Sequence, residues 1–404
     1  MSLLARATKL RHLAIRAARL AVDRGVPPSW FGYRWVRRQT MAELLSRADA
    51  SELIASYETI HPEAVVENPL PANVAKREQL PAERGWWGYS FRDVPARTST
   101  ETFIATLPDA RVVWYEDGRR QFHPAVLTSD DRSLDLREIR YRRPHADAFA
   151  RGHPLRLRRA TWILERVYDN HSHWLSAHLP KLLLLRDRGQ LDHVLLPPRL
   201  TPVMETSLRM LGLDPTAFAR FDPSRRLEVD QLTVIGTDRF RPELLRLVQQ
   251  AYAGSAPPAP HRRVFVSRAG ATRRRLVNEE ELWPLLRDVG FERVKMEELS
   301  FEAQVALMRE TAVLVAPHGA GLTNMLFCPP GAEIVEVADL SFPNPNFYAI
   351  ACAAGHRYWL LTGEHVGDAP PLERDLRIDL PSVTPLLRKL TTAGSAAGPD
   401  GPTA

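Results

Sequence analysis

The residues best placed to do chemistry in this chain surround a short glycine turn. An apolar run, Val313–Ala316, stops at Pro317, and His318 stands directly before residues 319–321, which read Gly-Ala-Gly. A short helical stretch, Leu322–Phe327, follows. This pattern predicts a strand, a turn and a helix whose free N–H groups and dipole meet at one point, where anions such as phosphate bind. An ordinary glycine-rich β–α turn has the same pattern, so this stretch alone does not decide between the two.

Polar side chains around this turn can extend an anion site toward a nucleotide or a sugar. Thr323 and Asn324 fall in the first helical turn, within reach of the same anion. His318 is expected at the exposed edge of the sheet, where it can hydrogen-bond a phosphate or a ribose. Glu336 lies near the end of the next apolar run, Glu333–Val337. We expect its carboxylate to accept hydrogen bonds from sugar hydroxyls.

A second candidate group is basic. The segment Arg263–Ser267 has the pattern of a strand, Arg268 follows it, and residues 273–275 are three consecutive arginines. Parallel strands end at the same edge of a sheet, so Arg268 is expected beside the glycine turn. Its forked, permanently charged guanidinium suits a pyrophosphate. At least one of the arginines 273–275 is expected to be a solvated loop residue instead.

A third group lies in the other half of the chain, where Asp169, His171 and His173 lead into a leucine-rich helix. A histidine at such a loop–helix junction can act as a general base near neutral pH. Zinc binding would need further ligands, and no zinc-type spacing supplies them. Helix capping and local hydrogen bonding is the competing interpretation for both histidines.

Alternating strands and helices must position these groups. Strands are expected at 161–167, 192–196, 227–235, 263–267, 293–296, 313–316, 333–337 and 356–361. Helices are expected at 172–188, 202–211, 242–253, 279–289 and 301–310. Asn278, with Glu281 three residues on, and Ser300 are the expected N-caps of the last two helices. Such alternation on both sides of a proline-rich linker predicts two parallel-sheet α/β domains with a ligand site in the cleft between them.

The region before these elements has a different pattern. Short alternating runs at 111–115 and 119–127 flank the turn Glu116-Asp117-Gly118, which indicates a β-hairpin in a short β-rich segment. Residues 1–24 have the pattern of a basic amphipathic helix that could lie on an anionic membrane surface. A helix packed on its own domain has the same pattern.

Composition limits the class of protein. The chain has 404 residues, 44% hydrophobic and 25% charged, as in ordinary globular proteins. It has no uninterrupted apolar run long enough for a transmembrane helix. Its first residues are too densely charged for a secretory signal. With two cysteines, Cys328 and Cys352, it is not a disulfide scaffold, and a reducing cytoplasm fits best.

The net charge of +6 is carried largely by arginine. A basic surface can bind nucleic acid, an anionic membrane or phosphorylated substrates, and a high-GC genome can also raise the arginine content. No zinc-finger spacing or aromatic-basic sheet signature accompanies the charge, so no nucleic-acid partner is expected.

Three segments, taken in this order, resemble glycosyltransferase family 61. They read VFVSRAGATRRRLVNEEEL (264–282), ELSFEAQVALMRETAVLVAPHGAGLTNMLFCPPGAEIVEV (298–337) and, more loosely, NHSHWLSAHLPKLLLL (170–185). This family includes plant xylan-decorating xylosyl- and arabinosyltransferases, animal protein-modifying N-acetylglucosaminyltransferases and many bacterial proteins. With the elements in between, the resemblance covers about 155–361. The first 95 residues and the tail from Ala393 resemble no family that we can name.

The resemblance implies an α/β protein of GT-B type, with two Rossmann-like parallel-sheet domains facing a cleft. It implies a bacterial-type glycosyltransferase of polysaccharide biosynthesis that inverts the anomeric carbon without a metal or other cofactor. The donor would be a nucleoside diphosphate sugar, UDP-sugar being the first expectation, and the transferred unit a hexose, a pentose or an N-acetylhexosamine. The acceptor would be a glycan or lipid-linked hydroxyl. Such a protein would be cytoplasmic, with possible peripheral membrane contact through residues 1–24.

On this basis the chain divides into an N-terminal helical or irregular extension (1–95), an acceptor-side domain (96–253), a linker (254–260), a donor domain (261–392) and a disordered tail (393–404). The implied donor-binding residues are Ser267, Arg268, Arg273, Arg274, His318, Gly319, Ala320, Gly321, Thr323, Asn324 and Glu336. The implied candidates for the catalytic base are His173, His171 and Asp169.

One departure from the family leaves the base open. Relatives often carry an acidic residue four positions after the histidine that aligns with His173, and this chain has Ala177 there, followed by His178. Either histidine could be the base, Asp169 could substitute, or the chain could be catalytically weak. The alternative function is therefore a non-catalytic nucleotide-sugar or glycan-binding protein with the same fold.

Overall fold

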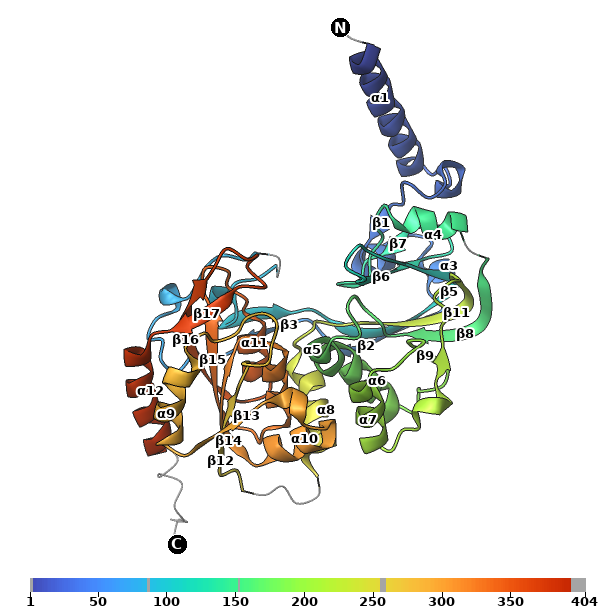
Figure 1. Ribbon diagram of the computed structural model, residues 1–404. Coiled ribbons are helices and arrows are strands. Elements are labelled where there is room, and N and C mark those ends of the chain that lie inside the picture. The colour runs from blue at the N-terminus through green and yellow to red at the C-terminus, as the bar shows by residue number, and fades with distance from the viewer. Residues whose placement is uncertain (1–2, 86–87, 152, 255–258, 394–404) are drawn as a thin grey trace.

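A computed structural model describes residues 3–85, 88–151, 153–254 and 259–393. Most of the expected linker and tail lie outside these residues. The described chain forms two lobes, each built on one sheet (Figure 1). We call the residues around the nine-stranded sheet (38–61 and 102–236) the N-terminal lobe, and those around the six-stranded sheet (262–378) the C-terminal lobe. The division into domains stays a prediction.

The sheet of the N-terminal lobe is mixed rather than parallel, which corrects the expectation for this half. Its strand order is β1-β7-β6-β5-β11-β8-β9-β10, and β2 also pairs with β5. The long strand β5 is antiparallel to β2, β6 and β11, whereas β11, β8, β9 and β10 are parallel to one another. The tight turn at Asp117 forces the antiparallel pairing of β5 with β6, since parallel neighbours need a long crossover.

The strands of this sheet are β1 (Arg38–Gln39), β2 (Ser56–His61), β5 (Thr102–Glu116), β6 (Phe122–Leu127), β7 (Ser133–Leu134), β8 (Leu155–Trp162), β9 (Val194–Leu196), β10 (Ala219–Arg220) and β11 (Leu227–Gly236). Strand β8 begins and ends earlier than the expected strand at 161–167. The exposed Arg156 and Arg158 alternate with the half-buried Leu155 and Leu157, and this alternation is hard to see in a sequence so rich in arginine. A two-stranded sheet pairs β3 (Ala64–Glu67) with β4 (Ala96–Ser99).

The six-stranded sheet confirms the parallel expectation for the C-terminal half. It consists of β12 (Arg262–Val266), β13 (Phe291–Val294), β14 (Thr311–Pro317), β15 (Glu333–Asp339), β16 (Arg357–Val366) and β17 (Asp375–Ile378). The order is β13-β12-β14-β15-β16-β17, parallel except for β17. In chain order its first five strands follow the 2-1-3-4-5 arrangement of doubly wound folds. The connections reverse direction between β12 and β14, and the carboxyl ends of these two strands define the switch point.

Helices cover both sheets. They are α1 (Leu3–Asp23), η1 (Pro28–Phe31), α2 (Met41–Leu45), α3 (Ala50–Leu53), η2 (Arg77–Gln79), η3 (Phe91–Asp93), α4 (His145–Arg151), α5 (His171–His173), η4 (Trp174–His178), α6 (Leu179–Asp187), α7 (Pro202–Met210), η5 (Pro215–Ala217), α8 (Pro242–Ala253), α9 (Glu279–Arg287), η6 (Met296–Glu298), α10 (Phe301–Arg309), η7 (Ala320–Phe327), α11 (Asn346–Ala353) and α12 (Leu380–Ala393). Each expected helix is confirmed to within a few residues.

The two expected N-caps have different outcomes. The hydroxyl of Ser300 accepts a hydrogen bond from the backbone N–H of Ala303 (3.2 Å), which confirms it as the cap of α10. Asn278 is not a cap, because its buried amide bonds both backbone groups of Ile378 on β17, at 2.8 and 3.1 Å. A buried amide gains more from two strand partners than from one exposed cap, so the tertiary contact prevails over the local signal.

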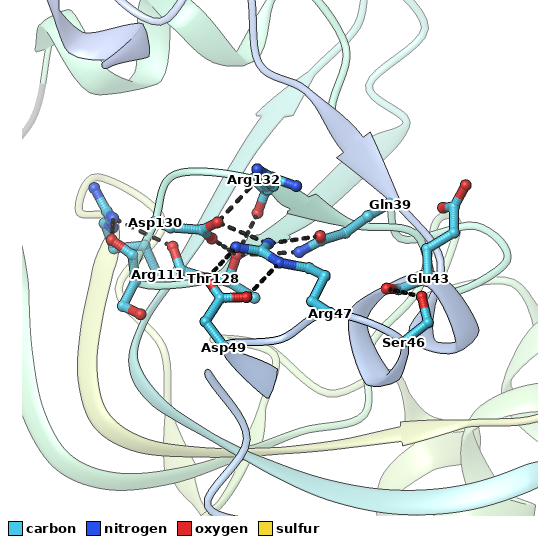
Figure 2. Close-up of polar contacts among 10 residues, drawn as sticks. Gln39, Glu43, Ser46, Arg47, Asp49, Arg111, Thr128, Asp130 and Arg132 are labelled. Atoms are coloured by element: carbon cyan, nitrogen blue, oxygen red, sulfur yellow. Dashed lines mark hydrogen bonds and ion pairs between the residues drawn. The ribbon is translucent and has the colours of Figure 1, made fainter. Parts of the chain in front are cut away.

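The first 95 residues are not only helical or irregular, because strands β1, β2 and β3 lie in this stretch. A polar cluster attaches the segment to the N-terminal lobe (Figure 2). In it the guanidinium of Arg47 pairs with Asp49 and with Asp130, at 2.7 and 2.8 Å, and donates to Gln39 at 3.0 Å. Gln39 in turn contacts Thr128. This cluster adds to the apolar contacts of Met41, Leu44 and Leu53, which pack in the main core.

One continuous cluster of buried apolar side chains runs through both lobes. It includes Trp162 and Leu182 in the N-terminal lobe, Leu245 on α8, and Leu322 and Tyr348 in the C-terminal lobe. A separate cluster lies under α9 and α12, on the other face of the six-stranded sheet. Helix α1 projects away from the rest of the molecule (Figure 1).

Candidate functional site

The glycine turn and Arg268 meet at the switch point, as the sequence predicts. Arg268 follows the carboxyl end of β12, and Gly319 follows that of β14. A Cβ atom added to Gly319 would lie 2.3 Å from Nη1 of Arg268 and 2.9 Å from its Cζ. The backbone of Gly319 is extended (φ 174°), so the glycine is required by this close approach and not by its conformation.

The loop that follows Arg268 folds back and fixes its guanidinium. Nε donates to the carbonyl of Arg274 at 3.0 Å, and Nη2 donates to the carbonyl of Arg273 at 2.9 Å. Arg268 forms no ion pair with any described residue, although the charges of Glu297 and Asp375 act on it. It lies beside the first N–H groups of η7, which have no intrahelical acceptor. This arrangement offers positive charge and N–H donors to an anion.

Arg274 and His318 line a small cavity of about 20 Å³ next to the turn, which we call the Arg274 cavity. Burial lowers the pKa of Arg274 to about 10, with a further contribution from the charge of Arg268. Its Nε atom is shielded from solvent and has no hydrogen-bond partner among the described residues. Arg274 also has a left-handed backbone (φ 55°), a conformation that costs about 1 kcal/mol or more outside glycine. Strain and an unsatisfied buried donor at one residue indicate a ligand site.

Glu336 does not lie where the sequence predicts, at the surface and free to bind sugar hydroxyls. Its side chain is 0% exposed, and both carboxylate oxygens are occupied. One accepts from Nδ1 of His318 and the other from the hydroxyl of Tyr358 at 2.7 Å. Because Nδ1 of His318 donates, Nε2 is the acceptor for the amide of Asn344 at 3.1 Å. Glu336 therefore orients His318 and does not face the cavity.

Two further expected donor-site residues are also buried. Thr323 and Asn324 are both 0% exposed on η7, because this short helix turns them toward the core and not toward the anion site. Asn324 accepts from Nε2 of His171 at 2.8 Å and donates to Gln304 at 2.9 Å. His171 thus joins the N-terminal lobe to η7 and α10, and its expected role as a base does not fit this position.

The remaining expected donor residues divide into packed and exposed groups. Ser267 is buried and donates to Glu279. Arg273 is exposed and pairs with Glu373 at 3.3 Å. Arg275, the third consecutive arginine, pairs with Asp375 at 2.7 Å and is exposed as well. The structure therefore brings Arg268, Arg274, His318 and residues 319–321 together, and it turns the others away.

His173 lies in a second, larger cavity of about 940 Å³, which we call the His173 cavity. Residues of both lobes line it, with Asn346 and Leu372 on the C-terminal side. Leu372 lines the Arg274 cavity as well, so the two cavities are neighbours. Asp169 is exposed and does not line either cavity. Of the three candidates for a base, His173 is the one at a cavity.

The surroundings of His173 keep its imidazole neutral. Burial lowers its pKa well below the ordinary value, and the charges of Arg239 and Arg137 act in the same direction. Its Nδ1 atom is shielded and has no hydrogen-bond partner among the described residues. Ala177 is buried close by in η4 and supplies no carboxylate. His178 instead donates from Nδ1 to the carbonyl of His173 at 3.0 Å.

Six arginines that were not predicted as site residues line the His173 cavity, namely Arg84, Arg97, Arg119, Arg137, Arg166 and Arg239. For two of them, the position in the sequence could have indicated a ligand site. Arg166 and Arg239 follow the carboxyl ends of the parallel strands β8 and β11 within a few residues, which is where ligands bind in such sheets. Arg137 and Arg97 lie in an irregular loop and on a two-stranded sheet, where no pattern distinguishes them.

The described residues bring together no group of three or more His, Cys, Asp and Glu side chains that could hold a metal ion. Within the same residues, no helix combines the length and the apolar character needed to span a bilayer.

These features define an α/β protein with a basic glycine turn at the switch point of its parallel sheet, next to a cavity lined by a histidine whose pKa is lowered by burial. Residues 171–335 match the family model described as Glycosyltransferase 61. The match confirms the resemblance inferred from the sequence and covers His173, Arg268, Arg274 and the glycine turn.

Curated relatives agree with this family. The chain is 33% identical over 123 residues to the β-1,2-xylosyltransferase XAX1 of Oryza sativa subsp. japonica, which is 29% of this chain and 21% of that protein. It is 36% identical over 105 residues to the EGF domain-specific O-linked N-acetylglucosamine transferase of Drosophila melanogaster (25% and 20%). It is 28% identical over 102 residues to a β-1,2-xylosyltransferase of Arabidopsis thaliana (22% and 19%). The chain thus matches about a fifth of the length of each relative.

Proposed function

We propose that this chain is a glycosyltransferase that moves a sugar from a nucleoside diphosphate to an acceptor hydroxyl, with inversion at the anomeric carbon and without a metal. The observation that carries the proposal is the meeting of Arg268, Arg274 and the turn 319–321 at the switch point, next to the cavity of His173. The named relatives, which are sugar transferases, support the reaction class.

The donor is assigned to the C-terminal lobe, as in a GT-B arrangement. A leaving diphosphate carries charge that must be neutralised as its bond to the sugar breaks. Arg268, Arg274 and the N–H groups of residues 319–321 supply that charge and those donors, which is why no metal is needed. His318, oriented by Glu336, lines the same cavity and is placed to bind the nucleotide portion. A UDP-sugar is the first candidate donor.

The acceptor is assigned to the His173 cavity. The oxygen of its hydroxyl attacks the anomeric carbon from the side opposite the diphosphate. The bond from that carbon to the phosphate oxygen breaks, and its electron pair leaves with the diphosphate. The acceptor proton passes to the neutral imidazole of His173, which later releases it to water. Direct displacement of this kind inverts the anomeric centre.

The place of action is the inner face of the cytoplasmic membrane, with a glycan or a lipid-linked sugar as acceptor. Helix α1 supports this part of the proposal, because its sequence is basic and it exposes Leu10, Leu13 and Leu20 away from the body of the molecule. A basic helix with an exposed apolar side is suited to an anionic bilayer surface.

A thermal-shift screen of the purified chain tests the donor site. UDP, GDP, CDP and TDP are compared in the presence of EDTA, since a ligand that binds only the native state raises the melting temperature. We expect a shift with one diphosphate that is lost in Arg268→Ala and kept in Arg287→Ala, an exposed arginine on α9. If no diphosphate raises the melting temperature, the metal-free donor site is wrong.

A non-catalytic nucleotide-sugar-binding protein is the second candidate, and the absence of a carboxylate beside His173 among the described residues favours it. Both candidates bind the nucleotide, but only a transferase releases it from the donor when acceptor is added. Binding without release across a panel of acceptors would favour the second candidate.

A further inference from the structure

The His173 cavity carries more positive charge than its own carboxylates neutralise. Six arginines line it, against four carboxylates, those of Asp93, Asp117, Glu138 and Asp238. Four of these arginines come from separate elements: Arg97 from β4, Arg137 from the loop after β7, Arg166 from the loop after β8 and Arg239 from the loop after β11. Two of them are paired within the cavity, Arg97 with Asp238 and Arg166 with Glu138 at 2.8 Å.

The other two of these four, Arg239 and Arg137, have no carboxylate to themselves. Arg239 has no carboxylate partner among the described residues, and its contacts are the hydroxyl of Ser176 at 3.5 Å and the ring of Phe240. Arg137 pairs with Glu165, but the same carboxylate also pairs with the buried Lys181. The charge of Glu138 also acts on both arginines, but this carboxylate is itself paired with Arg166, so a bound anion would stabilise the half-buried Arg137 and Arg239.

Two independent features of the cavity also indicate a ligand. The Nε atoms of Arg137 and Arg239 are shielded from solvent and have no hydrogen-bond partner in the described structure. Arg137 and Val167, both at the cavity wall, have left-handed backbones (φ 53° and 58°). A β-branched residue such as Val167 rarely adopts this conformation, and strained backbone conformations are more frequent at binding sites than elsewhere.

We propose that the His173 cavity binds an oxyanion carried by the acceptor, a phosphate or a carboxylate close to the hydroxyl that is glycosylated. Arg239 and Arg137 are its main ligands, and Arg166 is a secondary one. The assignment to the acceptor rests on the proposed function. A lipid-linked acceptor supplies a phosphate next to its sugar, and a uronic acid in a glycan supplies a carboxylate.

The location favours the acceptor over the donor as the source of this anion. The four cavity arginines come from the N-terminal lobe, the β4 segment and the loop that directly follows β11, whereas the proposed donor site lies at the ends of β12 and β14. A volume of about 940 Å³ accommodates one or two sugar units with their charged group, and it exceeds what a phosphate alone requires.

Calorimetric titration tests the proposal on the full chain. Inorganic phosphate and glucuronate are titrated separately into the protein saturated with the diphosphate that the thermal screen selects, and glucose is the uncharged comparison. We expect the acids to bind and glucose not to bind. Arg239→Gln should weaken binding of the acid about tenfold or more, the range for a lost charge-assisted hydrogen bond, and leave the affinity for the diphosphate unchanged. Phosphate binding alone points to a lipid-linked acceptor, and glucuronate binding alone to an acidic glycan.

Arg159→Gln is the matched control, because Arg159 is exposed on β8 and lies outside the cavity. If Arg239→Gln does not fold, Arg166→Gln, whose side chain is partly exposed, replaces it. Competition between phosphate and the diphosphate, with loss of diphosphate affinity in the cavity variant, would reassign the arginines to the donor and overturn the proposal. No binding of either acid, or unchanged binding in the cavity variants, would also overturn it. A wild-type chain that binds no diphosphate in the thermal screen would contradict the proposed function instead.

Discussion

At the residue scale, burial has two opposite effects on His173 as a base. It lowers the pKa of the imidazole, so the neutral form that accepts a proton dominates at pH 7. It also weakens the base, because a lower pKa reduces the driving force for proton transfer. The nearby charges of Arg137 and Arg239 act with burial, and an acceptor anion that pairs with these arginines would raise the pKa again. On the proposal of an acceptor anion in this cavity, we expect His173 to become more basic once the acceptor is bound.

The pH dependence of turnover should show this change in the pKa of His173. The free enzyme loses activity only when His173 becomes protonated, so kcat/KM should stay level from pH 8 down past 6.5 and decline below that value. The acidic limb of kcat, which reports the complex, should lie at higher pH than that of kcat/KM when the acceptor is acidic. Steady-state rates between pH 4.5 and 8.5 measure both. A limb in kcat/KM at or above pH 6.5 would contradict the burial argument.

Two substitutions decide which group is the base. His173→Ala should lower kcat about a hundredfold or more and leave the affinity for the nucleoside diphosphate unchanged. Asp169→Asn should have little effect, since Asp169 is exposed and outside both cavities. The reverse result, with the rate lost in the Asp169 variant, would move the role to that carboxylate.

At the element scale, the turn between β14 and η7 has glycine at position 319, and the missing side chain leaves room for the guanidinium of Arg268. Gly319→Ala should displace this guanidinium, which two backbone carbonyls hold in place, and weaken diphosphate binding about tenfold. Gly118→Ala is the control, because nothing lies within 4 Å of an added Cβ there. Calorimetric affinities measure both variants. Equal affinity in Gly319→Ala and the native chain would mean that Arg268 does not contact the diphosphate.

The same turn shows what a sequence can predict about a site. The strand, the glycine turn and the arginine after β12 follow local patterns, and parallel strands bring them to one edge whatever the rest of the chain does. The direction of each side chain is not local. Glu336 and Asn324 have the residue types of ligands, but the packing of Tyr358 and His171 turns them inward. The mixed sheet of the N-terminal lobe was missed for a similar reason, since the pairing of β5 with β11 joins segments about a hundred residues apart.

Helix α1 exposes large apolar side chains among its described residues. Leu10, Leu13 and Leu20 are 66%, 55% and 49% exposed and recur at helical spacing. We expect the chain to co-sediment with vesicles that contain phosphatidylglycerol, less strongly at high salt because screening weakens the basic contribution. Deletion of residues 1–24 should abolish binding, and Leu13→Ser with Leu20→Ser should weaken it severalfold.

Leu45→Ser is the control for these variants, because Leu45 is similarly exposed on α2 but lies outside the helix. Equal binding to vesicles of phosphatidylcholine alone would show that charge plays no part. Unchanged binding after the deletion would remove the support for membrane contact.

At the scale of the whole molecule, the two lobes share one core and a chain of side-chain hydrogen bonds. The apolar cluster continues from the N-terminal lobe through α8 into the C-terminal lobe. Beside it, His171, Asn324 and Gln304 form a hydrogen-bonded series from α5 to α10. The site therefore depends on both lobes being folded at once, and a loss of stability in either lobe should also disrupt the site.

Buried histidines make that stability depend on pH. Burial lowers the pKa of His145 and of His356 to about 4, and it lowers the pKa of His178 well below the ordinary value of 6.5. Below pH 6.5 the unfolded chain binds protons that the folded chain does not, so stability falls as the pH is lowered from about 6.5 toward 4. Each such histidine lowers the free energy of unfolding by up to about 1.4 kcal/mol for each pH unit of acidification in this window.

Thermal unfolding between pH 4.5 and 8 measures the effect. The melting temperature should be level above pH 7 and fall progressively below 6.5. His356→Gln, which can still donate to the carbonyl of Met325, should reduce the slope because it removes one titrating group. His153→Gln, at an exposed position, should leave the slope unchanged. A melting temperature independent of pH across the window would mean that these histidines are as easily protonated in the folded chain as in the unfolded one, and that the core around them admits water.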